Sequence, residues 1–281
     1  MINDRETNKV YIAEGLKAYT TVCMNLLNAF LENGIDADYL PLTKSPKHIW
    51  VRDYMPIQTG AGEFLQYTYK PDYLKDDPSY IPKYRAIAKR LGLQCRRTRL
   101  VIDGGNVVKC GDKVIMTDKV FDENAPIPKC MIISELHRYL GADVVLIPWD
   151  RYEPYGHADG MVRYIGKGTV LLNNYWDFDR GLRKKLIEDL KPYFGIEELH
   201  YDSPRCSKMS WAYLNFLQTE KHIFVPGLGI KEDYLALEQI QGFYPKHKVV
   251  LIPGCQDLVR DGGALNCISW NIFEDEDDLP Y

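Results

Sequence analysis

Five stretches of the chain carry apolar residues at helical spacing. Residues 14–34, for example, place Cys23, Leu26 and Phe30 three and four positions apart, which predicts an amphipathic helix. The five patterns end at or near Gly34, Gly92, Gly141, Gly195 and Gly242. Glycine just beyond the last turn is a common helix stop, because it adopts the left-handed backbone conformation without strain.

Each helical pattern leads into a run rich in Val, Ile, Leu and Tyr, which predicts a strand. These runs are DADYLPL, CRRTRLVI, DVVLIPW, EELHYD and KVVLIPG, and further strand-like runs follow in EFLQYTY, KVIMTD, TVLLNNY and HIFVPG. The chain is therefore predicted to contain five units of helix, strand, loop, strand and strand. A period of about 50 residues indicates a closed ring of similar units, with an ordinary α/β sandwich as the alternative.

No linker rich in proline or serine interrupts the repeat. We therefore expect one domain over residues 1–272. The acidic stretch from 273 to 281 is expected to form a loose tail.

Unusual polar residues occupy the same slot in every unit, just after its first strand. In chain order the slots hold Asp53 in WVRDYMP, Asp103 in DGGN, His157 and Asp159 in GHAD, Asn215 in YLNF, and Cys267 in DGGALNC. If the units surround an axis, these side chains converge at its centre. The glycine pairs 104–105 and 262–263 would allow close approach of the backbone to a ligand.

Composition excludes several classes of protein. The chain lacks an apolar run long enough to span a membrane, and its charged start lacks a signal-peptide core, so a cytoplasmic location is expected. A net charge of −4 and a pI near 5.9 argue against a nucleic-acid partner. The seven cysteines include no Cys-x-x-Cys pair, which argues against a zinc site or a disulfide framework. A third and fourth ligand beside His157 and Asp159 are not evident, so neither a metal nor another cofactor is expected.

The motifs WVRDYMP, IDGGN, GHAD, YLNF and GGALNC, taken in this order, resemble the guanidine-modifying superfamily. Within it the chain is most similar to the agmatine deiminase and bacterial peptidylarginine deiminase family, from about residue 45 to about residue 272. The resemblance implies an α/β fold in which five blades surround a pseudo-fivefold axis, the pentein fold. Two residues depart from the family pattern: Asp103 stands where the family usually has Glu, and Asn266 where agmatine deiminases often have His.

The resemblance implies a role for each residue of the slots. A guanidinium carbon is a poor electrophile because its charge is delocalised, so attack requires a soft nucleophile, and Cys267 as thiolate would supply it. His157 would protonate the departing ammonia and then activate water, with Asp103 orienting its ring. Asp53 and Asp159 would clamp the cation, because planar guanidinium pairs well with carboxylates. Trp50 would flank the substrate through a cation–π contact.

Taken alone, each of these residues has a simpler interpretation. Cys267 could be a buried small apolar residue and His157 a hydrogen-bonded structural histidine. Asp53 could pair with Arg52, and Asp103 could be a turn residue. Trp50 could belong to the core.

The predicted function is a deiminase of the hydrolase class that acts on C–N bonds of linear amidines. It would convert a guanidino group to a ureido group and ammonia. Agmatine is the first-choice substrate, with arginine, methylarginine and peptidylarginine as further substrates and amidino transfer as the alternative reaction. The expected partner is a small guanidine, without nucleic acid or membrane, and a homodimer is left open. Residues 69–82, rich in Tyr, Asp and Pro, are a candidate lid.

Overall fold

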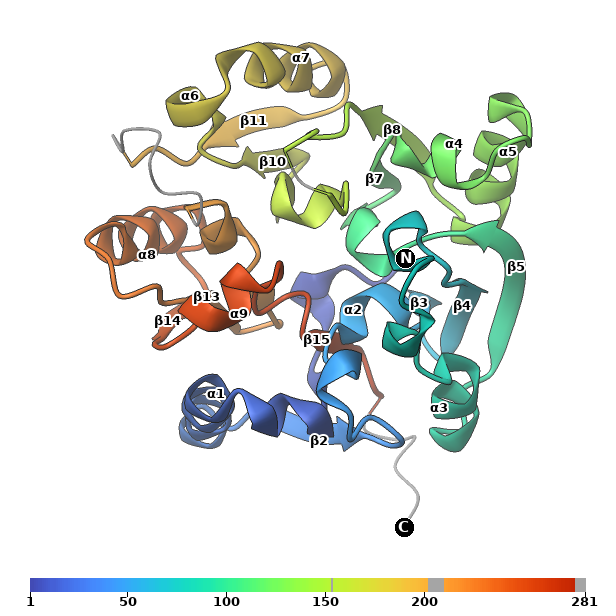
Figure 1. The fold of residues 1–281 in the computed structure, drawn as a ribbon. Helices are drawn as coiled ribbons and strands as arrows, with labels where there is room; N and C mark the ends of the chain where they lie inside the picture. The colour runs from blue at the N-terminus through green and yellow to red at the C-terminus, as the bar shows by residue number, and fades with distance from the viewer. Residues whose placement is uncertain (153, 202–209, 276–281) are drawn as a thin grey trace.

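The computed structural model describes residues 1–152, 154–201 and 210–275. In this part of the chain five three-stranded sheets follow one another around a central axis, with the long helices on the outside of the ring (Figure 1). In every sheet the inner and middle strands are antiparallel, and the middle and outer strands are parallel. The predicted five-bladed pentein fold is confirmed.

Each blade consists of an inner, a middle and an outer strand, in that order from the axis. Blade 1 contains β15 (Ser269–Ile272), β1 (Lys9–Ala13) and β2 (Asp36–Leu40); blade 2 contains β3 (Ile57–Gly60), β4 (Glu63–Thr68) and β5 (Cys95–Val101); blade 3 contains β6 (Val108–Cys110), β7 (Lys113–Thr117) and β8 (Asp143–Ile147). Blade 4 contains β9 (Val162–Gly166), β10 (Thr169–Leu172) and β11 (Gly195–Glu198); blade 5 contains β12 (Leu217–Gln218), β13 (His222–Pro226) and β14 (Lys248–Ile252).

One long helix in each blade crosses from the middle to the outer strand, as parallel pairing requires. These helices are α1 (Thr20–Glu32), α3 (Tyr84–Arg90), α5 (Lys129–Leu140), α7 (Arg180–Leu190) and α8 (Glu232–Phe243). Four short helices lie in the connections: α2 (Val51–Tyr54), α4 (Lys119–Glu123), α6 (Tyr175–Phe178) and α9 (Gln256–Arg260). The apolar residues whose spacing predicted α1 lie on the side of the helix that packs inward, since Cys23, Leu26 and Phe30 are buried.

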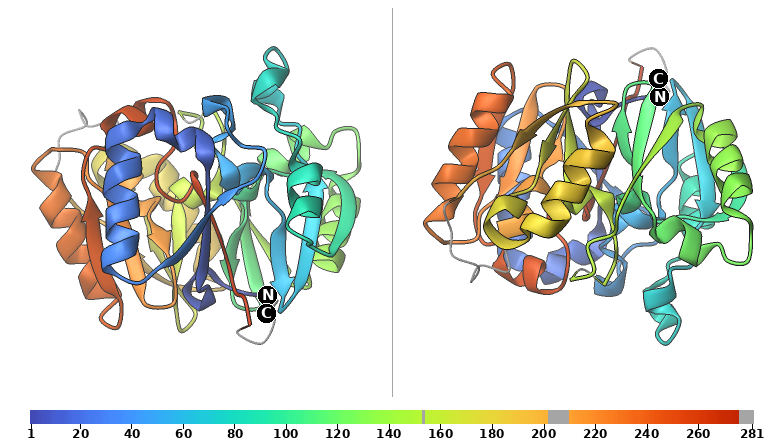
Figure 2. Two further views of the ribbon diagram at one scale, coloured as in Figure 1. Left: turned by 90° about the horizontal axis from the view of Figure 1, so that it is seen from below. Right: turned by 90° about the horizontal axis from the view of Figure 1, so that it is seen from above.

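The ring is closed by the two ends of the chain. Strand β1 pairs with β15 in antiparallel register, with Lys9 opposite Ile272 and Ile12 opposite Ser269. Figure 2 shows this blade beside its two neighbours, with the helices on the outer side of every sheet. Strand β15 ends at Ile272, and the extent of the domain stays a prediction.

The expected loose tail lies largely outside the described residues. Where it is described, Phe273 and Glu274 still hydrogen-bond to the body of the protein, through Gln58 and Asn8.

One predicted helix stop is wrong. Gly34, Gly92 and Gly141 have positive φ just beyond their helices, as expected. Helix α8 ends at Phe243, next to the predicted stop at Gly242, but α7 already ends at Leu190, and Gly195 is the first residue of β11. The predicted units also do not coincide with the blades. A unit counted from one helix to the next contains the outer strand of one blade and the inner and middle strands of the following blade.

Candidate active site

The predicted slot lies between blades. After each outer strand the chain returns to the axis, makes a short helical turn and enters the inner strand of the next blade. Asp53 lies on α2, Asp103 precedes the 3-10 turn Gly104–Asn106, and His157 precedes the turn Ala158–Gly160 that contains Asp159. Residues of consecutive turns contact one another, so groups far apart in sequence meet at the axis.

His157 lies between two carboxylates. Its Nε2 atom is 2.9 Å from Asp103 Oδ2, and its Nδ1 atom is 3.7 Å from Asp53 Oδ1. Gly105 makes this approach possible, because a Cβ there would lie 2.7 Å from His157 Nδ1 and 2.8 Å from Asp53 Oδ1. Any side chain at residue 105 would therefore displace the imidazole or the carboxylate.

Cys267 lies at the end of the last connection, two residues before β15. Its thiol donates to Asn215 Oδ1 at 3.2 Å and lies 4.0 Å from Asp159 Oδ2. Its backbone N–H also points to Asn215 Oδ1, and its carbonyl accepts from the Arg52 N–H at 3.1 Å. Cys267 is buried, with 7 % of the residue exposed.

Asn266 completes the acidic side of the site. Its side-chain amide donates to Asp159 Oδ2 at 2.6 Å, and its own Oδ1 makes no hydrogen bond within the described residues. The departure from the family pattern at this position thus places an amide, in place of a second imidazole, beside the carboxylate.

Burial and the three carboxylates dominate the electrostatics of the site. Burial raises the pKa of Asp53 to about 7, an effect that His157 opposes and that Asp103 and Asp159 strengthen. Burial lowers the pKa of His157, but Asp53 and Asp103 outweigh it and raise this pKa to about 9. Burial, with Asp159 and Asp53, raises the pKa of the Cys267 thiol well above its usual value. The imidazole is therefore protonated at neutral pH while the thiol keeps its proton.

Several buried acceptor atoms at the site have no hydrogen-bond donor among the described residues. They are Asp53 Oδ1, Asp103 Oδ1 and Asn266 Oδ1. Buried acceptors are normally satisfied, so these oxygens indicate a ligand rich in N–H groups. A guanidinium carries five such donors and no acceptor.

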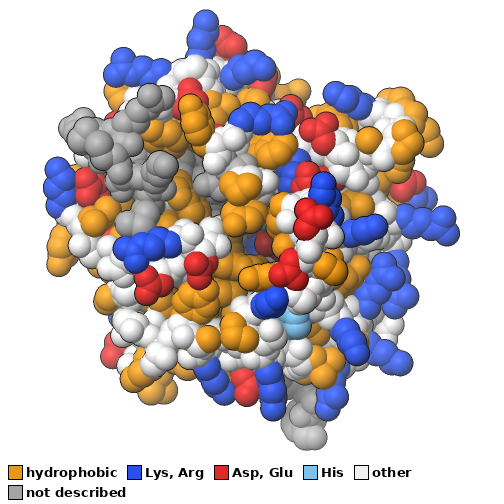
Figure 3. All heavy atoms as spheres, in the orientation of Figure 1, with side chains coloured by type: hydrophobic (Ala, Val, Ile, Leu, Met, Phe, Trp, Pro, Cys, Tyr) orange, Lys and Arg blue, Asp and Glu red, His pale blue; other side chains and the backbone are white. Residues whose placement is uncertain are grey.

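Trp50 lies at the edge of this group. It precedes α2 and its ring packs on Gly263, where any Cβ would overlap the ring. On the facing side the hydroxyl of Tyr155 approaches Gly262, whose φ is +99°. The second glycine pair therefore receives two aromatic side chains that line the opening. Figure 3 shows a hollow near the middle of this face, rimmed by hydrophobic side chains and with the red of an acidic group inside it.

The candidate lid covers one side of the site. Tyr73 donates its hydroxyl to Asp103 Oδ2 at 3.1 Å, and its ring meets those of Tyr155 and His157 edge-on. Asp72 pairs with the buried Lys119 at 3.0 Å, and Lys119 also donates to the Tyr155 carbonyl.

Two carboxylates of the lid are paired with lysines. Asp72 pairs with Lys119, and Asp77 pairs with Lys47. Carboxylates of the lid could meet a second positive charge of a substrate if they were free, but Asp72 and Asp77 already pair with lysines. The lid contacts the site through the hydrogen bond from the Tyr73 hydroxyl to Asp103.

The structure brings together five of the six residues predicted from sequence: Asp53, Asp103, His157, Asp159 and Cys267. Trp50 lies at the rim. Asn215, which occupied the right slot but offered no chemistry of its own, is a direct hydrogen-bond partner of the Cys267 thiol. Tyr73 was missed as a site residue, because only the fold shows which tyrosine of the lid turns inward.

Other kinds of site are not seen in residues 1–152, 154–201 and 210–275. There, no group of three or more His, Cys, Asp or Glu is arranged to hold a metal ion, and no helix is both long and apolar enough to cross a bilayer. The six cysteines in these ranges are free thiols, and Cys206 lies outside them.

The fold is that of the guanidine-modifying pentein proteins. The sequence pattern of the Porphyromonas-type peptidyl-arginine deiminase family matches residues 2–272, and the chain belongs to this family. An agmatine deiminase of Ectopseudomonas mendocina is 24% identical over 92% of this chain and 84% of its own. A C. jejuni agmatine deiminase solved with substrate bound is 16% identical, with a TM-score of 0.76 over 97% of this chain and 96% of its own. An amidinotransferase of saxitoxin biosynthesis from Microseira wollei is 12% identical, with a TM-score of 0.65 over 96% and 95%.

Proposed function

We propose that residues 1–272 form a deiminase that hydrolyses a guanidinium group to a ureido group and ammonia, with agmatine as the first-choice substrate. The observation that carries the proposal is the convergence of a thiol, an imidazolium and three carboxylates in one buried site. Asp159 Oδ2 lies 4.0 Å from Cys267 Sγ, and His157 lies between Asp53 and Asp103. Agmatine is preferred because relatives that cover most of the chain are agmatine deiminases.

Substrate binding would create the nucleophile. The guanidinium would pair with Asp53 and Asp159, and its charge would remove the repulsion that holds the proton on Cys267. The thiol proton then leaves to solvent, and the thiolate attacks the guanidinium carbon. Positioning by two carboxylates brings the carbon to the sulfur without a further change of charge in the site.

His157 would act twice. As imidazolium it donates a proton to the departing nitrogen, so that ammonia leaves and a thiouronium remains on Cys267. The neutral imidazole then takes a proton from water, and the resulting hydroxide attacks the same carbon. Collapse of this adduct breaks the C–S bond, releases the ureido product and restores the thiol. Asp103 would keep the ring in place through both steps.

A product assay tests the proposal directly. The protein is incubated with agmatine, arginine, methylated arginines or arginyl peptides, and ammonia and the ureido product are measured without an amine acceptor. We expect equal amounts of both products, with the highest kcat/KM for agmatine. Absence of ureido product from every guanidine would overturn the proposal, and turnover only after an amine is added would identify amidino transfer.

The pH dependence of kcat/KM should be bell-shaped, because this parameter reports the free site. Asp53 must be ionised to hold the cation, so the rate rises with pH through about 7. His157 must be protonated to release ammonia, so the rate falls above about 9. The maximum is expected between these two limbs. A flat profile from about pH 6 to about pH 10 would contradict both assignments. In Asp103→Asn the basic limb should move to lower pH, since one of the charges that raise the His157 pKa is lost.

Asp103→Glu should lower kcat, although it restores the residue usual in the family. Asp103 already lies 2.9 Å from His157 Nε2, and the backbone behind it is held by Gly104, where any Cβ would overlap the Arg52 carbonyl. An added methylene would push the imidazole aside, and a displacement of about 1 Å is expected to reduce the rate roughly 100-fold. Asp103→Asn should be worse because it also removes the charge. Asp112→Glu, on the exposed turn between β6 and β7, is the matched control and should leave kcat unchanged.

A further inference from the structure

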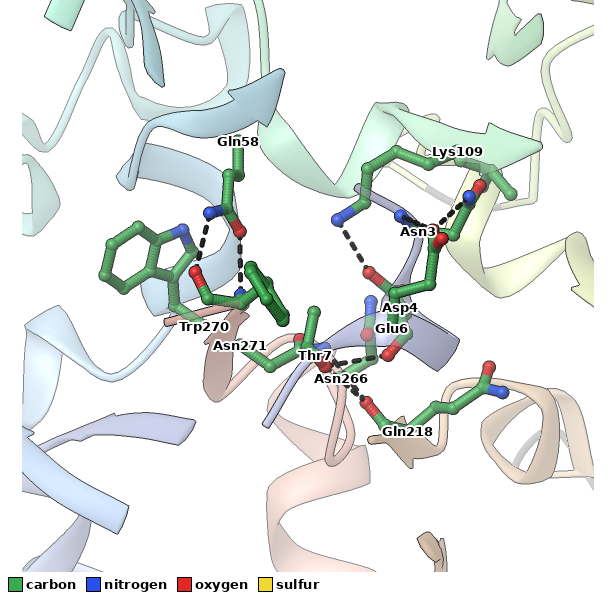
Figure 4. A network of polar contacts seen from close by, with 12 residues as sticks. Asn3, Asp4, Glu6, Thr7, Gln58, Lys109, Gln218, Asn266, Trp270 and Asn271 are labelled. Atoms are coloured by element: carbon green, nitrogen blue, oxygen red, sulfur yellow. Dashed lines mark hydrogen bonds and ion pairs between the residues drawn. The ribbon is translucent and has the colours of Figure 1, made fainter. Parts of the chain in front are cut away.

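A second charged cluster lies at the axis, built from residues that the proposed reaction does not use. Lys109 Nζ, Arg163 Nη2 and Arg52 Nη1 lie 2.8, 3.2 and 3.9 Å from the carboxylate oxygens of Asp4. Arg52 and Arg163 are 8% and 3% exposed, and the Lys109 side chain is 7% exposed. Figure 4 shows Lys109 extending from β6 to Asp4, with Gln58 and Trp270 across from it.

The charges of this cluster do not balance. Within the described residues Asp4 is the one carboxylate that pairs with these three cations, which leaves an excess of two positive charges. Burial of an uncompensated charge is strongly unfavourable. Burial accordingly lowers the pKa of Lys109, although Asp4 opposes this effect. Arg163 Nη2, despite its short distance to Asp4, makes no hydrogen bond among the described residues.

A cavity adjoins two of the three cations. Its volume is about 20 Å³, and its walls include Arg52, Lys109, Gln58, Asn271, Met55 and Trp270. Roughly 10–15 Å³ is enough for one water molecule, so this cavity has room for a small ion. Its lining residues do not include Asp53, Asp103, His157, Asp159 or Cys267.

We propose that this cavity is a binding site for a monatomic anion, a chloride-sized halide, held between Arg52 and Lys109. The anion would offset the excess positive charge that Asp4 leaves, and the apolar walls from Met55 and Trp270 would exclude competing water. Arg52 connects this site to the nucleophile, because its Nε–H donates to the Asn266 carbonyl and its backbone N–H to the Cys267 carbonyl.

Thermal unfolding tests the proposal without any assay of activity. The protein is titrated from zero to about 0.2 M sodium chloride, with sodium methanesulfonate holding the ionic strength constant, because that anion has the same charge but is not monatomic. We expect a saturable rise in Tm of about 2–5 °C as chloride increases. An equal Tm in both salts would mean that the cavity holds only water and would overturn the proposal.

Two variants should change the response in opposite directions. Lys109→Met removes a wall cation and should abolish the chloride dependence, whereas Asp4→Asn removes the competing carboxylate and should lower the half-saturating chloride concentration about tenfold. Lys113→Met, on the neighbouring strand β7 and paired with Asp112, is the control and should respond like the unmodified protein. An unchanged response in folded Lys109→Met would overturn the proposal. If that variant does not fold, the unmodified protein is crystallised in bromide and its anomalous scattering is measured. An anomalous peak beside Arg52 and Lys109 would support the site, and its absence would refute it.

Discussion

Replacing Cys267 by alanine should abolish turnover while the protein remains folded. Within the described residues the side chain makes only two weak hydrogen-bond contacts, to Asn215 and Asp159, so its loss removes little packing. The whole covalent route depends on this sulfur, and loss of a nucleophile typically lowers kcat by on the order of 10⁴-fold or more. The measurement is ammonia release, together with circular dichroism to confirm the fold.

Cys255→Ala is the matched control. Cys255 is buried as well, and its thiol donates to the Ile252 carbonyl, so the packing loss is comparable. It lies outside the site, and the variant should retain its rate. If Cys267→Ala kept the rate of the unmodified protein, the covalent mechanism would have to be abandoned.

Thiol labelling should distinguish Cys130 from Cys267. In the free protein Cys267 is buried beside two carboxylates and its pKa is raised, whereas Cys130 is exposed. Alkylating reagents should therefore label Cys130 before Cys267. Under the proposed mechanism Cys267 should become reactive when a cation occupies the site.

The second large effect concerns the clamp. Asp159→Asn and Asp53→Asn should each lower kcat/KM by roughly 100- to 1000-fold, because a charge-assisted contact worth about 3 kcal/mol or more is lost in a closed site. Asp159→Asn also turns the acceptor of the Asn266 amide into a group that can present a second donor to it. Both variants should bind the substrate more weakly and form less thiolate.

Asp257→Asn is the control for the clamp, since Asp257 is exposed and its ion pair is with Arg260, on the same short helix. It should keep the kcat/KM of the unmodified protein. A clamp variant that stayed within a few-fold of that value would show its aspartate to be structural.

The repeat and its slots could be predicted because they depend on local pattern. Apolar spacing identifies a helix such as α1, and runs of branched residues identify outer strands such as β8 and β14. The inner strands could not be found this way. Strand β12 has two residues and β6 has three, too few for an alternating pattern, and they are held by partners on other parts of the chain.

The candidate site was predictable in membership but not in geometry. A polar residue in a repeated slot identifies Asp53, Asp103, His157, Asp159 and Cys267. Nothing in the slot of Asn215 indicates that its oxygen accepts from the thiol of a residue 52 positions away. The pairing of Arg52 is a similar case, because Asp53 follows it but its guanidinium turns to Asp4 at the start of the chain. Such contacts depend on how five blades close, which no local pattern contains.

The closure of blade 1 has a consequence for the order in which the protein is made. Strand β1 is synthesised first among the strands, yet its inner partner β15 is the last, and the Lys9–Ile272 pairing spans nearly the whole chain. Contacts of such sequence separation form late in folding, because the loop they close is long. Cys267 arrives with that final strand and reaches Asn215 and Asp159 only when the ring shuts. A nascent chain on the ribosome would therefore already hold its histidine and carboxylates in place while remaining chemically inert, and reactivity would begin at the moment of closure.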